Sequence, residues 1–207
     1  MPRRPAAQRL FLGSADLDAL PGWLESLPEM PRRAVLIPTA ANPLPDAPFA
    51  KVADELLQRA GLEVELLGLE NSSQLDVDRA LDQAQLVFVC GGYAMHLLEH
   101  VQRSGFDETV KQAVREGCLA YAGISAGAVL AGPDLRTFAD PDDPGRPATT
   151  SGLGLVPFTV LPHRNRGRAE RHDRLATGQG RFVSINDDQA VTVTGGHWTV
   201  EPYARRR

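Results

Sequence analysis

Hydrophobic residues along this chain fall into two alternating patterns. Short continuous runs predict buried strands, at residues 34–37, 62–67, 86–90 and 118–122. Apolar positions at helical spacing predict helices between and after these strands, at residues 52–60, 75–84, 94–101 and 106–114. Because strands separated by helices form βαβ units, the pattern predicts an α/β fold with a mostly parallel sheet.

The alternation weakens after Phe158. Shorter strand-like runs follow at residues 182–185, 190–193 and 198–200, which we expect to be antiparallel additions. Before them, residues 138–154 are rich in proline, glycine and aspartate and show no hydrophobic period. A loop of this length is uncommon in a compact domain, so we expect it to be functional, mobile or both.

Length, charge and cysteine content narrow the class of protein. The length of 207 residues is typical of a single domain, which we expect to span residues 1–207. The net charge of −4 disfavours nucleic-acid binding, because phosphate backbones attract basic surfaces. No apolar run reaches the ~7–15 residues of a signal peptide or the ~20 of a membrane span, so we expect no membrane partner. Cys90 and Cys118 are too few for a disulfide framework, which favours the cytoplasm.

The sharpest motif is Gly123-Ile124-Ser125-Ala126-Gly127-Ala128. It follows a predicted strand and opens a short apolar segment, which is the context of a Gly-x-Ser-x-Gly nucleophile elbow. Glycines are needed on both sides because larger side chains would clash in so tight a turn. The sequence therefore predicts Ser125 as a nucleophile at the carboxyl edge of the sheet.

A serine nucleophile needs a general base, and the chain has five histidines. His163 follows an apolar run and so stands at a strand end, where parallel sheets present catalytic groups. His96 and His100 are four residues apart on a predicted helix without a metal-ligand motif, so we expect a solvated helix face. We expect His172 on the surface of a charged helix and His197 at a turn. His163 is the predicted base.

The base in turn needs a carboxylate to orient it. Two groups of aspartates compete for this role. Asp140, Asp142 and Asp143 precede His163, whereas Asp187 and Asp188 follow it between two strand-like runs. Aspartate is also favoured in ordinary turns, so the residues alone leave the choice open.

Several motifs together resemble one family, the peptidase E (aspartyl dipeptidase) group, peptidase family S51. They are residues 123–128, Ile37-Pro38-Thr39-Ala40, Val89-Cys90-Gly91-Gly92, Gly152-Leu153-Gly154-Leu155 and Pro162-His163. The resemblance runs from about residue 34 to residue 194 and is more specific than any single motif. It implies a three-layer, doubly wound α/β fold like that of the class I glutamine amidotransferases, which is flavodoxin-like.

The resemblance also implies a catalytic triad in the order serine, histidine, acid. Ser125 matches the nucleophile and His163 the base, while the turn at Asp187 matches the acid. Asp188 remains an alternative acid. Asp140 matches a position in the family's mobile active-site loop and is the second choice for an essential acid. The oxyanion donors would be backbone N–H groups at Gly91 or Gly92 and at Ala126. No metal or organic cofactor is implied.

One departure from the family concerns substrate contacts. Many relatives have Gly-Gly-Asn-Thr-Phe where this chain has Gly91-Gly92-Tyr93-Ala94-Met95, so Tyr93 replaces a polar contact and aspartyl specificity is in question. Five arginines lie between residues 164 and 174, and of these Arg171 and Arg174 are the preferred candidates for binding a substrate carboxylate.

These observations predict a serine exopeptidase, like dipeptidase E, acting on short peptides. The alternatives are a cyanophycinase-like or isoaspartyl amidase, a carboxypeptidase-type specificity, and a non-catalytic amidotransferase-like binding domain. A cysteine amidotransferase is disfavoured because Cys90 and Cys118 both lie in strand-like runs, where buried thiols are expected. The sequence leaves a homo-oligomer open.

Overall fold

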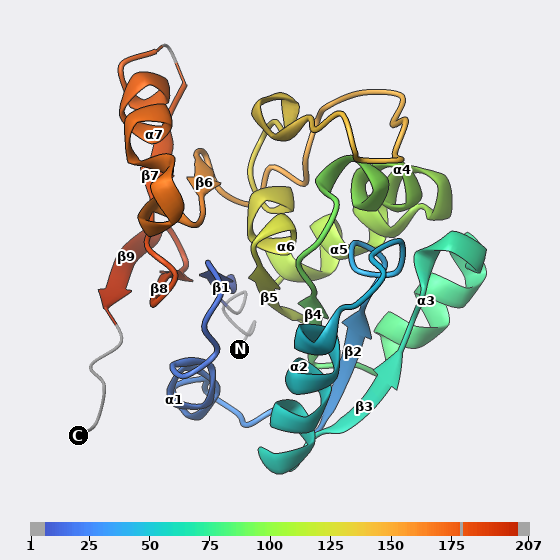
Figure 1. Ribbon diagram of the computed structural model, residues 1–207. Coiled ribbons are helices and arrows are strands. Elements are labelled where there is room, and N and C mark those ends of the chain that lie inside the picture. Colours follow the sequence, from blue (N-terminus) through green and yellow to red (C-terminus); the bar gives the residue numbers. More distant parts are fainter. Residues whose placement is uncertain (1–6, 179, 203–207) are drawn as a thin grey trace.

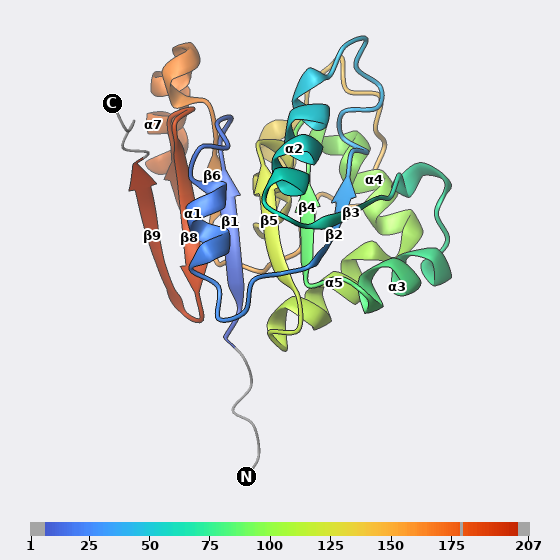
Figure 2. The ribbon, with the colours of Figure 1, turned by 90° about the horizontal axis from the view of Figure 1, so that it is seen from below.

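The computed structural model describes residues 7–178 and 180–202, and its centre is a seven-stranded sheet of order β3-β2-β4-β5-β1-β8-β9. Figure 2 shows these strands side by side. The strands are β1 (Arg9–Gly13), β2 (Arg33–Ile37), β3 (Glu63–Leu66), β4 (Leu86–Val89), β5 (Ala120–Ile124), β8 (Gln189–Thr194) and β9 (His197–Pro202). Neighbours from β3 to β1 are parallel, and β8 and β9 add antiparallel pairs. The predicted mostly parallel α/β sheet is confirmed.

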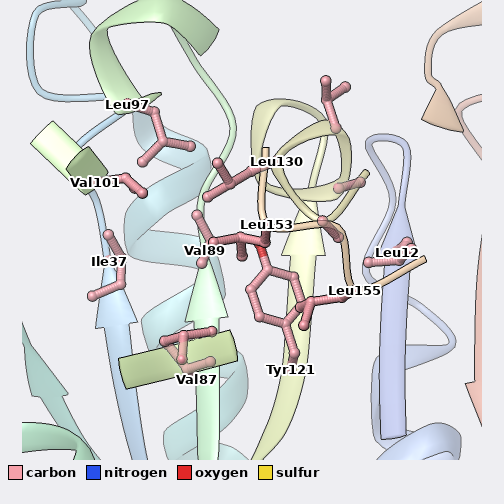
Figure 3. Close-up of a cluster of buried hydrophobic side chains, with 14 of the residues drawn as sticks. Leu12, Ile37, Val87, Val89, Leu97, Val101, Tyr121, Leu130, Leu153 and Leu155 are labelled. Atoms are coloured by element: carbon pink, nitrogen blue, oxygen red, sulfur yellow. The ribbon is translucent and has the colours of Figure 1, made fainter. Parts of the chain in front are cut away.

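Helices cover both faces of this sheet. They are α1 (Leu20–Glu25), α2 (Pro48–Arg59), α3 (Gln74–Asp82), α4 (Ala94–Ser104), α5 (Phe106–Arg115) and α6 (Ala126–Leu130). Ala34 and Leu36 of β2 pack with α1 and α2, whereas Val35 and Ile37 pack with α3 to α6. This alternation along a strand divides the core into two clusters and makes three layers. Figure 3 shows part of the cluster that contains Ile37, in which strand residues meet α4 and α6.

A second, two-stranded sheet lies beside the main one. Its strands β6 (Thr159–Leu161) and β7 (Phe182–Ser184) run parallel, and α7 (Ala169–Ala176) connects them after the irregular turn η3 (Arg164–Arg168). Figure 1 shows this unit on the side where β8 and β9 lie. The expectation of an antiparallel addition at residues 182–185 is wrong, because the connecting helix makes β6-α7-β7 a parallel crossover. Two short 3-10 helices, η1 (Leu69–Asn71) and η2 (Arg136–Phe138), complete the elements of the described residues.

Strand β1 was not predicted, although it occupies an inner position between β5 and β8. Its apolar run, Leu10 to Leu12, is only three residues long and gives little periodic signal. Pairing with strands distant in sequence makes it a strand, and the chain leaves it at Ser14 beside the carboxyl end of β5. Within the described residues, no helix has both the length and the apolar character needed to cross a bilayer.

The long loop at residues 138–154 is tied to α4. The buried carboxylate of Asp143 accepts hydrogen bonds from the backbone N–H groups of Met95 and His96, at 2.7 and 2.9 Å. These N–H groups stand in the first turn of α4, where the helix itself offers them no acceptor. Further along, the Gln102 side chain donates to the Thr149 carbonyl at 3.0 Å and accepts from Ala148 N–H at 2.9 Å. These bonds hold the loop along one side of α4.

Tyr121 links the core to the turn that follows β5. Its side chain is fully buried, and its hydroxyl donates to the Gly127 carbonyl at 2.6 Å. We expect Tyr121→Phe to lower the free energy of unfolding by about 1–3 kcal/mol, because a buried acceptor loses this partner. Urea denaturation measures the change. Tyr93→Phe, in a less buried tyrosine, is the matched control and should stay within about 0.5 kcal/mol of the parent; equal losses in both variants would contradict the assignment.

Candidate active site

Ser125 stands in a tight turn between β5 and α6, with φ 52° and ψ −109°. A side chain on either flanking glycine would collide with backbone: a Cβ on Gly123 would lie 2.4 Å from the Gly127 carbonyl oxygen, and one on Gly127 would lie 2.2 Å from the Val89 carbonyl oxygen. Glycine is therefore required on both sides of the serine, as the elbow pattern predicts. The turn leaves the Ser125 hydroxyl at the carboxyl edge of the sheet.

His163 follows β6 and faces this hydroxyl. Its Nε2 lies 2.8 Å from Ser125 Oγ, within hydrogen-bond distance. The residue has the left-handed conformation φ 64° and ψ 34°, which is uncommon outside glycine. Its backbone N–H donates to Ser14 Oγ at 2.8 Å. The structure thus brings a strand end and the elbow together across 38 residues of sequence.

Asp187 lies in the turn between β7 and β8, on the other side of the imidazole. Its Oδ1 is 2.6 Å from His163 Nδ1. The Asp187 carbonyl accepts hydrogen bonds from the backbone N–H groups of Ala15 and Asp16, and its N–H donates to Asn165 Oδ1 at 2.9 Å. These bonds hold the backbone of Asp187 between two distant segments, the backbone of residues 15–16 after β1 and the side chain of Asn165.

The hydrogen bonds imply one tautomer of His163. The ionised carboxylate of Asp187 only accepts, so Nδ1 carries the proton and Nε2 is free to accept from Ser125. Burial lowers the pKa of His163 below its ordinary value, more than its bond to Asp187 raises it. For Asp187, burial raises the pKa of the carboxyl because it disfavours the charged form. The hydrogen bonds from His163 and Arg166 outweigh burial, so the pKa of Asp187 lies below its ordinary value. Both shifts favour a neutral base beside an ionised acid.

The competing aspartates lie elsewhere. Asp140 is exposed and accepts a hydrogen bond from Asp142 N–H at 3.0 Å, within its own turn. Asp143 holds the start of α4, as described above. Asp188 is exposed, and within the described residues no hydrogen bond joins it to His163.

One of the five arginines between residues 164 and 174 contacts the group formed by Ser125, His163 and Asp187. This arginine is Arg166. Its Nε donates to Asp187 Oδ2 at 2.6 Å. The other arginines have different partners. Arg164 forms a two-pronged pair with Asp173, Arg171 donates to the Thr137 carbonyl, and Arg174 lies 3.9 Å from Glu170. Of the two arginines preferred from the sequence, neither contacts Ser125, His163 or Asp187.

The backbone around Gly91 borders the nucleophile. A Cβ on Gly91 would lie 3.0 Å from Ser125 Cβ and 3.7 Å from its Oγ, so the two residues are in direct contact. Within residues 7–178 and 180–202, the N–H groups of Gly91, Gly92 and Ala126 donate to no other group. The N–H of Tyr93, by contrast, donates to the Ala40 carbonyl at 2.8 Å. Three backbone donors without a partner in the described residues therefore lie in the elbow, at Ala126, and in the segment beside it, at Gly91 and Gly92.

Three histidines are more buried than the sequence indicated. The expectation of a solvated helix face for His96 and His100 is wrong, and so is that of a surface position for His172. His172 is 3% exposed, because it packs on β7 and its Nδ1 lies 2.7 Å from Ser184 Oγ. His100 is 9% exposed, and its ring meets that of His96 edge-on at 4.5 Å. His96 Nε2 lies 3.8 Å from Glu70 because η1 packs against α4. No group of three or more His, Cys, Asp or Glu side chains among the described residues is arranged for metal binding.

The two cysteines differ in burial. Cys90 is buried, as expected, whereas Cys118 is exposed. The expectation for Cys118 is wrong because β5 begins at Ala120, two residues later than the apolar run suggests. Cys118 thus belongs to the turn that follows α5. Neither thiol is the residue in the elbow.

Ser14 was missed by the sequence analysis, although it touches His163 and Asp187. It is fully buried, and its Oγ lies 3.4 Å from both His163 Nδ1 and Asp187 Oδ1. The available signal was a polar Gly13-Ser14 pair directly after an apolar run, as at other strand ends. That signal depends on recognising β1 as a strand.

Comparisons with known proteins place the chain in a family. The model of peptidase family S51 matches residues 11–200. Peptidase E of Escherichia coli O6:K15:H31 is 35% identical over 202 residues, covering 87% of this chain and 85% of that protein. An uncharacterized peptidase of Listeria monocytogenes is 27% identical over 196 residues, covering 91% and 95%.

A solved structure agrees with this assignment. A crystal structure from Listeria monocytogenes, assigned provisionally as a peptidase E protein, superposes with a TM-score of 0.85 at 25% identity. The superposition covers 96% of this chain and all of the other. Since the family match extends over nearly the whole chain, the protein is a member of peptidase family S51 and a serine peptidase.

Proposed function

We propose that this protein is a serine exopeptidase that hydrolyses short peptides with Ser125 as nucleophile, His163 as base and Asp187 as the acid of the triad. One observation carries the proposal. An unbroken line of hydrogen bonds runs from Ser125 Oγ to His163 Nε2, at 2.8 Å, and from His163 Nδ1 to Asp187 Oδ1, at 2.6 Å. This is the geometry that serine acyl transfer requires.

The proposed reaction uses each of these groups in turn. His163 Nε2 takes the hydroxyl proton as Ser125 Oγ attacks the scissile carbonyl, and Asp187 stabilises the imidazolium. The negative oxygen of the tetrahedral intermediate accepts hydrogen bonds from the unused N–H groups of Gly91 or Gly92 and Ala126. The imidazolium then protonates the leaving amine, and water releases the acyl group by the same steps in reverse.

The finer proposal is that the cleaved peptide carries an N-terminal aspartate. The motifs that resemble the aspartyl dipeptidase group support it, and so does an arginine beside Asp187. Arg166 uses Nε on Asp187, and neither Nη1 nor Nη2 is hydrogen bonded within the described residues. A guanidinium that still has free donors can bind a carboxylate. We therefore propose Arg166, rather than Arg171 or Arg174, as the carboxylate contact nearest to the reaction.

A cleavage panel tests the proposed function. Dipeptides with N-terminal α-Asp, β-Asp or neutral residues, each also with blocked termini, are incubated with the protein, and the released amino acids are quantified. We expect cleavage of α-Asp dipeptides with a free amino group. Preferred cleavage of β-Asp substrates would replace this specificity with isoaspartyl amidase activity. An absence of cleavage together with an absence of labelling by a serine-directed phosphonate would refute the proposal.

The pH dependence of phosphonate labelling follows from the burial of His163. Only the neutral imidazole can take the Ser125 proton, so the labelling rate rises as pH increases through the pKa of His163. Because burial lowers this pKa from its ordinary value of 6.5, we expect the midpoint of the rise below pH 6.5. Mass spectrometry at a series of pH values measures the rate. A midpoint above pH 7 would contradict the assignment of His163.

We also propose a cytoplasmic location for the protein. Both cysteines are free in the structure, and Cys118 is exposed. An exposed thiol persists most readily in a reducing compartment.

A further inference from the structure

A buried serine outside the proposed triad connects two of its members. Ser14 follows β1, has no exposed surface, and accepts a hydrogen bond from the backbone N–H of His163 at 2.8 Å. We infer that Ser14 is a positioning residue, which holds His163 and Asp187 in register for the reaction of Ser125. The inference rests on the proposed function, since it assigns a role within the same site.

The first argument is the backbone conformation of His163. A left-handed φ of 64° is unfavourable for a residue with a Cβ, and it persists only where the surroundings impose it. The backbone N–H of His163 donates to Ser14 Oγ, and this bond joins His163 to the end of the inner strand β1. Without it, a buried N–H would lose its acceptor and the left-handed conformation would lose a constraint. The direction of the imidazole depends on that conformation.

The second argument is the position of Ser14 relative to Asp187. Ser14 N–H donates to the Gln189 carbonyl at 3.1 Å, and the next two residues donate their N–H groups to the Asp187 carbonyl. One segment, residues 14–16, therefore binds the backbone of the base and the backbone of the acid. The strand that precedes it lies between β5 and β8, so this segment is anchored in the sheet.

The third argument is the direction of the hydroxyl. Its oxygen accepts the bond from His163, so its own hydrogen is left to point toward the carboxylate. Ser14 Oγ is 3.4 Å from Asp187 Oδ1, which is longer than an ordinary O–H···O bond. At this distance the hydroxyl dipole adds a weak attraction, and the bond to His163 N–H carries most of the positioning. The side chain touches no reacting atom, which separates its role from that of the triad.

The test compares Ser14→Ala with Ser104→Ala. Ser104 is also buried, at 1% exposure, and among the described residues its hydroxyl bonds only to neighbouring backbone at the end of α4. A serine-directed phosphonate is reacted with each purified full-length protein, and the maximal labelling rate of Ser125 and the half-saturating probe concentration are determined separately. We expect Ser14→Ala to lower the maximal rate about tenfold, the factor for one lost hydrogen bond, with an unchanged half-saturating concentration. Ser104→Ala should keep the parent rate.

The outcomes separate the two proposals. Equal maximal rates for Ser14→Ala, Ser104→Ala and the parent would overturn the role of Ser14 while leaving the proposed function intact. An unlabelled parent protein would instead overturn the proposed function. If Ser14→Ala shows no cooperative thermal unfolding, Ser14→Cys takes its place, because a thiol is similar in size and a weak acceptor. A parent-like maximal rate in Ser14→Cys would then count against the inference.

Discussion

Replacing Ser125 with alanine is expected to abolish peptide hydrolysis while the fold is retained. The Ser125 hydroxyl is the only group at the elbow placed 2.8 Å from a neutral imidazole nitrogen among the described residues. Without it no acyl-enzyme forms, and we expect a loss of turnover of about 10⁴- to 10⁶-fold. Hydrolysis of the preferred dipeptide and the thermal unfolding midpoint are measured on the same preparation.

A control variant isolates this effect from changes in folding. Ser26→Ala removes a hydroxyl that donates to the Trp23 carbonyl at 2.7 Å, at the end of α1 and away from the site. It should keep parent activity. Substantial hydrolysis by a homogeneous Ser125→Ala protein would show that another residue is the nucleophile. Loss of both activity and cooperative unfolding in Ser125→Ala would instead indicate that the strained turn needs the serine for stability.

Asp187→Asn is expected to have the second largest effect, a loss of turnover of about 10⁴-fold. The asparagine keeps the size of the side chain, but its amide can donate to His163 Nδ1. The imidazole would then carry its proton on Nε2, which could no longer accept from Ser125. The variant also removes the charge that stabilises the imidazolium and leaves the 2.6 Å contact of Arg166 without a carboxylate.

Two neighbouring aspartates are matched controls for this substitution. Asp188→Asn and Asp140→Asn make the same chemical change at exposed positions, and both should keep activity close to that of the parent. Steady-state turnover of the three variants on one substrate decides between them. An inactive Asp140→Asn beside an active Asp187→Asn would transfer the role of the acid to the loop at residues 138–154.

Much of the architecture was predictable because its signals are local. The apolar run at residues 86–90 contains β4, and the helical spacing at residues 106–114 lies within α5. The elbow was predictable for a steric reason, since only glycine fits on both sides of Ser125. Such features depend on residues close together in the chain, and a periodic pattern reports them directly.

Burial and pairing were less predictable because they depend on distant partners. His172 lies on a highly charged helix, yet it is buried because α7 packs against β7. Strand β1 has only three apolar residues in succession, and it becomes an inner strand through pairing with β5 and β8. A residue's own neighbours in sequence carry little information on such contacts.

The sequence by itself determined the α/β class, the turn that presents Ser125 and the identity of a strand-end histidine. Glycine sterics and hydrophobic periodicity are local, so these features do not depend on the arrangement of the rest of the chain. The family resemblance pointed to Asp187 and left Asp188 and Asp140 open, and the tertiary structure places Asp187 against His163. Only the tertiary structure decided which arginine contacts that aspartate and that Ser14 joins the two residues. Asp187 is 24 residues from His163, and Ser14 is 149 residues away. Hydrogen bonds over such separations exist only after the sheet has assembled, because strand order determines which chain segments meet at its edge.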